Sequence, residues 1–219
     1  MNKLAADISQ QGHIVISAGT RERTLSNAIK RGMDLVLGSI LLVVTLPVLV
    51  IFSVLIRLES KGCALYRQER AGLNGKPFTL LKLRSMYQDA EADGARWADH
   101  RDTRITRVGA IMRPLRIDEL PQLVNILRGE MSLVGPRPER PIFIELLETE
   151  IPFYHLRTDD VKPGLTGLAQ VKYTYGASIE DARMKLVYDL AYAKNRSFLL
   201  DLRILASTVR VVLFRQGAR

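Results

Sequence analysis

The feature that most constrains this chain is an uncharged apolar run of 22 residues, 35–56, with the sequence LVLGSILLVVTLPVLVIFSVLI. As a straight helix it would be roughly 33 Å long, about the thickness of the hydrocarbon core of a bilayer. A signal peptide is excluded, because the run starts late, is too long and lacks a small-residue cleavage site after it. We therefore predict that this segment enters a membrane; a helix buried in a soluble core is the alternative.

Two features of the run argue against a simple crossing of the bilayer. Pro47 lies near its middle, where it removes one backbone donor and clashes with the preceding turn. By the positive-inside rule both ends lie in the cytoplasm, because basic residues flank both: Arg21, Arg23, Lys30 and Arg31 before the run, and Arg57, Lys61, Arg67 and Arg70 after it. We predict a re-entrant helix, broken at Pro47, that enters one leaflet and returns. A kinked transmembrane helix is the alternative, since proline is common in those.

The sequence divides into three segments, and its charge and aromatic content limit the kinds of partner. Residues 1–26 form a predicted polar leader, residues 27–60 the membrane helix, and residues 61–219 the remaining unit. The chain carries 32 Lys and Arg against 23 Asp and Glu, which favours an anionic partner: nucleic acid, anionic lipid or a phosphorylated small molecule. Aromatic residues make up only 6%, and no recognised motif interleaves them with basic residues, so we expect no nucleic acid.

The side chains available for a metal site are few. Cys63 is the only cysteine, which excludes an internal disulfide, and the three histidines are scattered along the chain. No cluster of cysteine and histidine has the spacing of a zinc site. A metal site must therefore use oxygen ligands, which favours magnesium or manganese.

Local patterns predict a hairpin and several helices after the membrane segment. Residues 64–83 have the form of two strands joined at Asn74-Gly75, a strong turn dipeptide. Residues 86–100 are charged and look helical, and apolar residues at helical spacing predict a helix that ends before Pro114. A further helix starts at residue 118 and ends at Gly129. The prolines of residues 132–141 predict a rigid loop without regular structure.

The C-terminal part of the chain is predicted to be helical. Ser178 to Asp181 resembles a capping box, with Asp in place of the usual Glu. Residues 198–214 place one broad apolar face along a helix, made of Leu199, Leu202, Leu205, Ala206, Val209, Val212 and Leu213. Such a helix either lies in the membrane interface or packs on the protein core, and the pattern leaves both open.

The stretch LRIDELPQL places two adjacent carboxylates, Asp118 and Glu119, at a predicted helix start. At an arbitrary helix start they would act as a cap and as a partner of the helix dipole. Here Arg113, Arg116 and Arg137 are close in the sequence, and arginines beside a carboxylate lower its pKa and keep it ionised, as a nucleophile or metal ligand must be. The same arginines can neutralise an incoming diphosphate. The pair is therefore a candidate catalytic site.

Several segments in a fixed order resemble one family, the monotopic phosphoglycosyl transferases, which are bacterial polyprenyl-phosphate sugar-1-phosphate transferases. The segments are KRGMDL, YRQERAGLNGKPFTLLKLRSM, DTRITRVGAIMR, RIDELPQLVNILRGEMSLVGPRP and VKPGLTGLAQV, within about residues 29–214. The resemblance implies an α+β, mostly helical fold with a small β-hairpin, interfacial amphipathic helices and an N-terminal re-entrant membrane helix. It also implies a place at the bacterial inner (cytoplasmic) membrane, with the catalytic unit on the cytoplasmic face.

The resemblance further implies transfer of a sugar-1-phosphate from a UDP-sugar to polyprenyl (undecaprenyl) phosphate, with release of UMP. Asp118 would be the nucleophile that forms a covalent phosphosugar intermediate and the ligand of Mg²⁺, and Glu119 would be its partner. The stretch Pro136-Arg137-Pro138 would bind the uridine phosphate end. We expect Arg113 to bind substrate as well. Lys82 and Arg84 are candidates for the lipid phosphate, and ordinary positive-inside charges explain these two equally well.

Two positions depart from the family pattern. Leu46 precedes Pro47 where members often have serine, so the bend geometry is not carried over, and residues 172–176 replace the Asn-Gly-Arg that often follows GLAQV. This variant resembles a branch linked to exopolysaccharide assembly, which implies glucose or galactose as the sugar. The expected partners also include membrane lipid and a homodimer. A membrane-tethered nucleic-acid module and an inactive scaffold are the competing classes, and the intact acidic pair argues against both.

Overall fold

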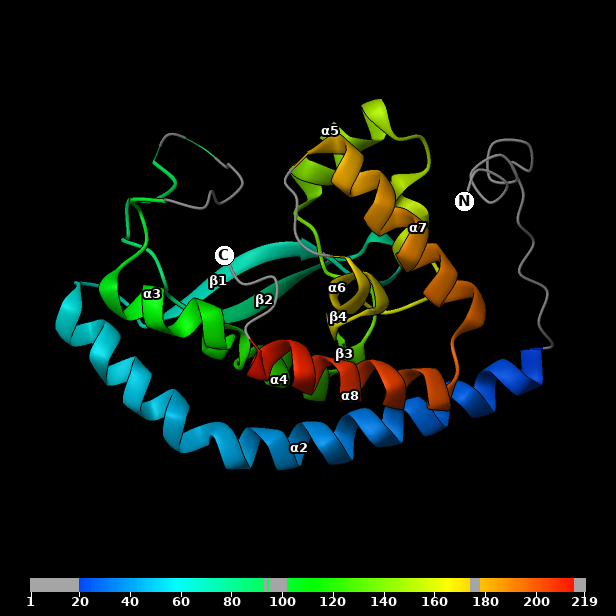
Figure 1. Cartoon of the computed structure of the whole chain (residues 1–219), viewed down its shortest axis with the longest axis horizontal. Helices are drawn as coiled ribbons and strands as arrows, with labels where there is room; N and C mark the ends of the chain where they lie inside the picture. Colours follow the sequence, from blue (N-terminus) through cyan, green and yellow to red (C-terminus); the bar gives the residue numbers. More distant parts are fainter. Residues whose placement is uncertain (1–19, 93, 95–101, 174–177, 215–219) are drawn as a thin grey trace.

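The computed structural model describes residues 20–92, 94, 102–173 and 178–214, and its elements stack above one long helix, α2 (Thr20–Glu59) (Figure 1). Three helices lie against α2: α3 (Arg107–Met112), α4 (Gln122–Arg128) and α8 (Phe198–Leu213). Above them lie the strands β1 (Leu65–Ala71) and β2 (Pro77–Leu83), and α5 (Pro141–Glu150) is on the far side. The predicted α+β, mostly helical class with a small hairpin is confirmed.

Helix α2 is continuous, so the predicted break at Pro47 is wrong. Pro47 lies inside the helix, and the helix curves with its concave side toward the rest of the protein (Figure 1). Proline removes one hydrogen bond from the helical ladder without ending the helix here. The hydroxyl of Thr45 donates to the carbonyl oxygen of Leu41 at 2.7 Å, a back-bond that often bends helices. Helix α2 is therefore bent and not broken.

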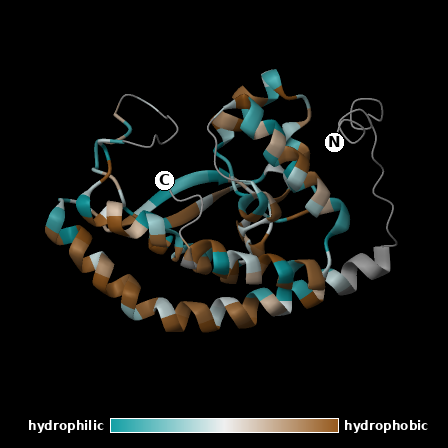
Figure 2. Cartoon of the chain, viewed as in Figure 1, coloured by the Kyte–Doolittle hydropathy of each residue, from teal (hydrophilic) through white to brown (hydrophobic). Residues whose placement is uncertain are grey.

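The middle of α2 is apolar (Figure 2), and one side of it packs on the body while most of its surface is left uncovered. Exposed large apolar side chains occur along its length: Leu35, Val36, Ile40, Leu41, Val43, Val44, Leu46, Val50, Ile51, Val54, Leu55 and Leu58. Among the described residues, Ser26–Glu59 is the one helical stretch long and apolar enough to cross a membrane. A helix of a soluble core would be covered on most sides, which α2 is not.

Charged side chains attach the N-terminal arm of α2 to the body. The ammonium of Lys30 donates to Asp201 at 2.6 Å, and the guanidinium of Arg31 donates to the carbonyl oxygens of Ile126 and Leu127 at 2.6 and 2.8 Å. The buried carboxylate of Asp34 accepts hydrogen bonds from β3 (Ser132–Val134). The basic flank predicted to face the cytoplasm therefore also docks this arm.

The C-terminal arm of α2 is attached to the same body. The carboxylate of Glu59 accepts the backbone N–H groups of Arg107 and Val108, at 2.7 and 3.0 Å, at the start of α3. Ile56 is buried in a cluster with Met112 and other apolar side chains of α3 and β2. Arg84 donates to the carbonyl oxygens that end the helix, those of Ser60 and Lys61. Both arms thus meet one side of one compact unit.

The hairpin forms as its turn chemistry predicts. Strands β1 and β2 pair antiparallel, from Leu65 opposite Leu83 to Ala71 opposite Pro77. The turn is a 3₁₀ segment, η1 (Leu73–Gly75), in which Asn74 and Gly75 adopt the positive φ angles for which these residue types are suited. From α4, the buried side chain of Asn125 accepts the N–H of Leu81 at 3.0 Å and fixes β2 against that helix.

Two predicted elements are corrected by long-range pairing. The predicted helix at residues 86–100 is wrong in its described part, because Met86 forms a bridge with Ile105 and turns follow to residue 92; residues 95–100 lie outside the described residues. The predicted loop at residues 132–141 begins with β3, which pairs parallel with β4 (Gly164–Thr166). Beyond it the backbones of Gly135 and Gly164 cross so closely that a Cβ on Gly135 would lie 2.2 Å from the carbonyl oxygen of Lys162.

The remaining helices close the far side and the edge of the unit. They are the 3₁₀ segment η4 (Tyr154–Thr158), α6 (Leu168–Lys172), α7 (Ile179–Asn195) and α8. The capping box predicted at Ser178 and Asp181 is confirmed. On α8, Asp201 and Ile204 are buried, while Leu199, Leu202 and Val209 of the predicted apolar face are exposed. That exposure favours the membrane interface over core packing for this face.

We predict that both ends of α2 lie on one side of the membrane, because both are bonded to the same unit. Cys63 is a native, exposed reporter near one end, and Ser26→Cys in a Cys63→Ser background provides one near the other. Both thiols should resist a membrane-impermeant maleimide applied outside intact cells and react after lysis. Labelling of only one of them in intact cells would show that α2 crosses the bilayer.

Candidate active site

The local backbone explains why two adjacent acidic side chains both enter the interior. After α3 the chain forms two 3₁₀ turns, η2 (Arg113–Leu115) and η3 (Ile117–Glu119), joined at Arg116, whose φ of 56° is left-handed. A non-glycine residue in this region stores strain, and such residues cluster at functional sites. The change of direction at Arg116 leaves Asp118 and Glu119 only 9% and 8% exposed, with α4 starting after Pro121.

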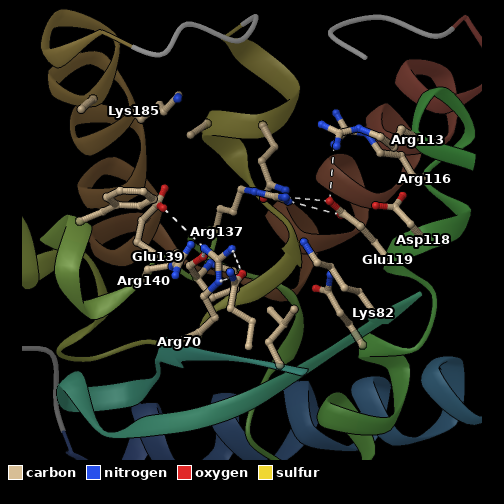
Figure 3. Close-up of a pocket in the computed structure, with 18 of the residues that line it drawn as sticks. Arg70, Lys82, Arg113, Arg116, Asp118, Glu119, Arg137, Glu139, Arg140 and Lys185 are labelled. Atoms are coloured by element: carbon tan, nitrogen blue, oxygen red, sulfur yellow. Dashed lines mark hydrogen bonds and ion pairs between the residues drawn. The ribbon is translucent and has the colours of Figure 1, made fainter. Parts of the chain in front are cut away.

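The pair lies in a basic pocket with a volume of about 280 Å³ (Figure 3). Its walls come from the hairpin, from η2 and η3, from residues 137–143 and from the start of α7. The acidic lining residues are Glu91, Asp118, Glu119 and Glu139, whereas the basic ones are Arg70, Lys82, Arg104, Arg113, Arg116, Arg137, Arg140, Arg157 and Lys185. The surplus of cations suits an anionic ligand such as a diphosphate.

Glu119 is held by arginines. Arg137 makes a two-pronged contact with its carboxylate, at 2.7 and 3.3 Å, and Arg116 lies 3.6 Å away (Figure 3). Burial on its own would raise the pKa of Glu119, but the charges of Arg137 and Arg116 outweigh it and lower the pKa to about 2. Glu119 is therefore ionised and fixes the position of the Arg137 guanidinium.

Asp118 is in a different electrostatic state from its neighbour. Burial and the charge of Glu119 raise the pKa of Asp118 to about 6, against the opposing effects of Lys82, Arg113 and Arg116. The predicted lowering of its pKa by nearby arginines is thus wrong for Asp118, because the closest arginine contacts go to Glu119. Among the described residues, no hydrogen bond or ion pair engages the Asp118 carboxylate.

Lys82 reaches the pair from strand β2. Its ammonium lies 5.0 Å from the centre of the Tyr66 ring, within the range of a cation–π contact. Burial, followed by the charge of Arg70, lowers the pKa of Lys82 to about 8, although the acidic pair opposes this. Lys82 is thus a cation that titrates close to neutral pH and faces the site in Figure 3.

The structure brings most of the predicted site residues together. Asp118, Glu119, Arg113, Lys82, Arg137 and Pro138 all line the pocket. Pro136 is buried beside it, and its carbonyl oxygen accepts the N–H of Gly164. Arg84 lies elsewhere: it is 6% exposed and its guanidinium bonds the end of α2, so the structure does not place it where it could bind a substrate in this pocket.

A buried ion pair beneath the pocket supports Arg137. Arg157 lies 2.6 Å from Asp189, both almost fully buried, and donates to the carbonyl oxygen of Arg137 at 3.0 Å and to the hydroxyl of Tyr154 at 2.6 Å. Burial raises the pKa of Asp189 to about 6. Burial alone would lower the pKa of Arg157, but the negative charges around it, that of Asp189 first, outweigh burial and raise it. At this distance from a guanidinium we treat the pair as ionised. It orients the backbone that presents Arg137 to Glu119.

Several residues line the pocket although nothing in the sequence predicted a place for them there. Arg70 counts in the sequence as one of the flanking charges of the membrane segment, yet it donates to the carbonyl oxygen of Pro138 at 2.9 Å. Arg140 pairs with Glu91 at 2.8 Å, and Lys185 reaches the pocket from α7. Their contributions come from segments distant in sequence, so only the folded arrangement reveals them.

The pocket suits a magnesium ion bound jointly by the protein and a substrate better than an ion bound by protein side chains alone. Among the described residues no group of three or more His, Cys, Asp or Glu side chains could hold a metal. Glu91, Glu119 and Glu139 are paired with arginines, which leaves Asp118 as the available carboxylate. Magnesium is commonly bound by one or two carboxylates together with substrate phosphates and water. The residues present are therefore compatible with Mg²⁺ bound at Asp118 with a phosphorylated substrate.

Comparison with known proteins identifies the family. Residues 25–215 match the model of the bacterial sugar transferase family, so the protein belongs to that family. The family resemblance inferred from the acidic pair and its flanking segments is confirmed.

Three relatives illustrate the similarity. A UDP-N-acetylgalactosamine-undecaprenyl-phosphate N-acetylgalactosaminephosphotransferase of Aeromonas hydrophila is 46% identical over 191 residues, covering 87% of this chain and 45% of that protein. UDP-glucose:undecaprenyl-phosphate glucose-1-phosphate transferases of Caulobacter vibrioides and Escherichia coli are 42% and 36% identical, over 86% and 84% of this chain. This chain spans 71% of the Caulobacter protein and 40% of the E. coli protein. The sugars in these names differ.

We predict that Asp189→Asn lowers the free energy of unfolding by about 3 kcal/mol, because it removes the nearer of the two carboxylates beside the buried Arg157 and leaves only Glu139, 3.8 Å away. The exposed Asp160→Asn is the matched control and should stay within about 0.5 kcal/mol of the wild type. Chemical denaturation of the detergent-solubilised protein measures both values. Equal stability of the two variants would mean that the ion pair contributes little.

Proposed function

We propose that this protein transfers a sugar-1-phosphate from a UDP-sugar to polyprenyl phosphate, with release of UMP, as the first membrane step of exopolysaccharide or other glycan assembly. The observation that carries the proposal is the unequal acidic pair, in which Arg137 holds Glu119 while Asp118 faces the basic pocket without a hydrogen-bond or ion-pair partner among the described residues. The names of the three relatives support the substrate classes.

In the first half of the reaction, Asp118 acts on the UDP-sugar. A carboxylate oxygen of Asp118 attacks the phosphorus that carries the sugar, and the bond from that phosphorus to the bridging oxygen breaks. UMP leaves with the electron pair, and the sugar phosphate stays on Asp118 as an acyl phosphate. Arg113, Arg116 and Arg137 offset the negative charge of the diphosphate, which would otherwise repel the attacking carboxylate.

In the second half, the phosphate of the lipid acceptor is the nucleophile. One of its oxygens attacks the phosphorus held on Asp118, the acyl phosphate bond breaks, and the carboxylate is restored. Lys82 and Arg113 line the pocket close enough to Asp118 to influence its pKa, so they can bind the incoming phosphate there. Lys82 keeps the role expected for it, and Arg84 is left out of the proposed mechanism.

Magnesium, when bound, would supply positive charge that offsets the repulsion between Asp118 and the diphosphate. Asp118 would hold the ion together with substrate phosphate oxygens. A cation beside Asp118 also favours its ionised form, which matters because burial and Glu119 hold its pKa at about 6. Glu119 is committed to Arg137, so in this proposal it positions that arginine.

The membrane arrangement suits a lipid acceptor. In the proposed orientation, the uncovered apolar surface of α2 enters one leaflet of the bacterial inner membrane and both basic arms stay on the cytoplasmic side. The exposed apolar face of α8 lies in the interface plane. The pocket then stands next to the leaflet, and a long lipid can present its phosphate without leaving the bilayer.

We predict that the wild-type protein, incubated with Mg²⁺ and a UDP-sugar alone, gains the mass of one sugar phosphate on Asp118 and releases UMP. Asp118→Asn should show no adduct and at least about a thousandfold less transfer, because an amide is a poor nucleophile. Asp160→Asn should keep the adduct, and EDTA should prevent it. Intact-protein mass spectrometry measures the adduct, and turnover by the Asn variant, with deamidation excluded, would contradict the covalent route.

We also predict that kcat/KM for the lipid acceptor falls as the pH rises through about 8. The ammonium form of Lys82, with a pKa of about 8, is the form that attracts the acceptor phosphate, and it is lost above that pH. Lys82→Arg keeps the positive charge to higher pH, so the fall in kcat/KM should move to higher pH. Initial rates between pH 6 and 10 measure the effect, and an unchanged pH dependence in the Arg variant would assign the fall to another group.

A further inference from the structure

We propose that an apolar strip formed by Ile111 on α3 and Leu115 on η2 holds the first isoprene units of the acceptor lipid and delivers its phosphate to Asp118. This inference rests on the proposed function and adds to it a binding surface for the lipid chain. The arginines of this segment line the pocket, whereas Ile111 and Leu115 do not.

The segment from Ile111 to Arg116 carries two chemically different kinds of side chain. Ile111 and Leu115 are 58% and 37% exposed, and neither of them lines the pocket. Arg113 and Arg116 line the pocket, and both arginines affect the pKa of Asp118. A ligand with an anionic head and an apolar tail matches this division of charge, with its head toward the arginines and its tail on the strip.

The strip also continues the apolar surface that faces the bilayer. Helix α8 contacts η2, and Val209 near its end and Phe214 just after it are exposed. Helix α3 contacts α2, whose middle is apolar and mostly uncovered. Exposing isoprene units to water is unfavourable, so the chain needs an apolar path from the leaflet to the pocket. Ile111 and Leu115 provide that path beside the pocket residue Arg113.

A phospholipid tail would meet the same strip if it served only to anchor the protein. The two occupants differ in what they change: an anchor sets how much protein binds the membrane, whereas an acceptor site sets the KM for the acceptor. A test must therefore measure vesicle binding and acceptor kinetics on the same variants.

The chain offers a matched pair of double variants. Ile111→Gln with Leu115→Gln removes the apolar surface of the strip. Ile142→Gln with Leu146→Gln is the control: both residues are 55% exposed, they share the spacing of four residues on α5, and this helix is far from α2 (Figure 1). Glutamine suits a helix and adds no charge. Each protein is reconstituted in nanodiscs of defined phospholipid composition.

For the strip variant we expect the KM for undecaprenyl phosphate to rise about tenfold. UMP release from the UDP-sugar without acceptor should stay within twofold, as should kcat/KM for a water-soluble phosphate ester with a single isoprene unit. Cosedimentation with vesicles should match the wild type. The control variant should match the wild type in all four measurements.

Three outcomes would overturn the inference: an unchanged KM for the long acceptor, an equal loss with the long and the one-unit acceptor, or reduced vesicle binding that accounts for the loss. Failure of the proposed function looks different. In that case the wild-type protein itself transfers no sugar phosphate to either acceptor. The wild type could also transfer the sugar phosphate but release no UMP when the acceptor is left out. That result would contradict only the covalent route, and the comparison of the two acceptors would still test whether the strip binds the lipid chain.

Discussion

The position of the candidate active-site pocket depends on the attachment of α2 at both of its arms. On one arm, Asp201 accepts a hydrogen bond from Lys30 at 2.6 Å and another from Tyr192 at 2.7 Å. On the other, Glu59 accepts two backbone N–H groups of α3. The buried charge of Asp201 would be costly without its partner, so the N-terminal arm does not separate easily from the body. Burial of Ile56 adds to the contacts of the half-buried Glu59 and holds the C-terminal arm. The apolar middle of α2 and the pocket therefore form one rigid arrangement, and α3, which leads to the acidic pair, starts at this attachment.

The acidic pair shows how neighbours of similar chemistry acquire different states. Arg137 is placed by its backbone contact to Arg157 and then neutralises Glu119, not Asp118. Asp118 is left with burial and a negative neighbour, both of which favour its protonated form. An arriving cation reverses that balance. In the proposed mechanism, a cation bound beside Asp118 would therefore complete the ionisation of the nucleophile.

Features set by local chemistry could be predicted from the sequence. The turn at Asn74-Gly75, the end of α4 at Gly129 and the capping box at Ser178 each depend on residues within a few positions of one another. The acidic pair and Arg137 could also be predicted to share a site, because one short, proline-rich motif contains all three. These predictions needed no knowledge of which segments pack together.

Features set by tertiary contact could not be predicted in this way. Arg84 follows Lys82 by two positions, which would place both on one face of a longer strand, but β2 ends at Leu83 and Arg84 turns to the end of α2. Ser132 to Val134 forms a strand only because residues 164–166 come alongside it. The pKa of Asp118 depends on which carboxylate Arg137 contacts, and sequence distance does not settle that choice.

The crossing of Gly135 and Gly164 limits which substitutions this protein can tolerate. The two backbones are joined by hydrogen bonds from Gly135 to Thr166 and from Gly164 to Pro136, and no side chain fits between them. The crossing immediately precedes the loop that carries Arg137. Substitutions in the pocket walls change side chains, whereas a substitution here would move the backbone that presents the arginine. Variation of the pocket walls therefore leaves the backbone of Arg137 in place only while these two positions stay glycine.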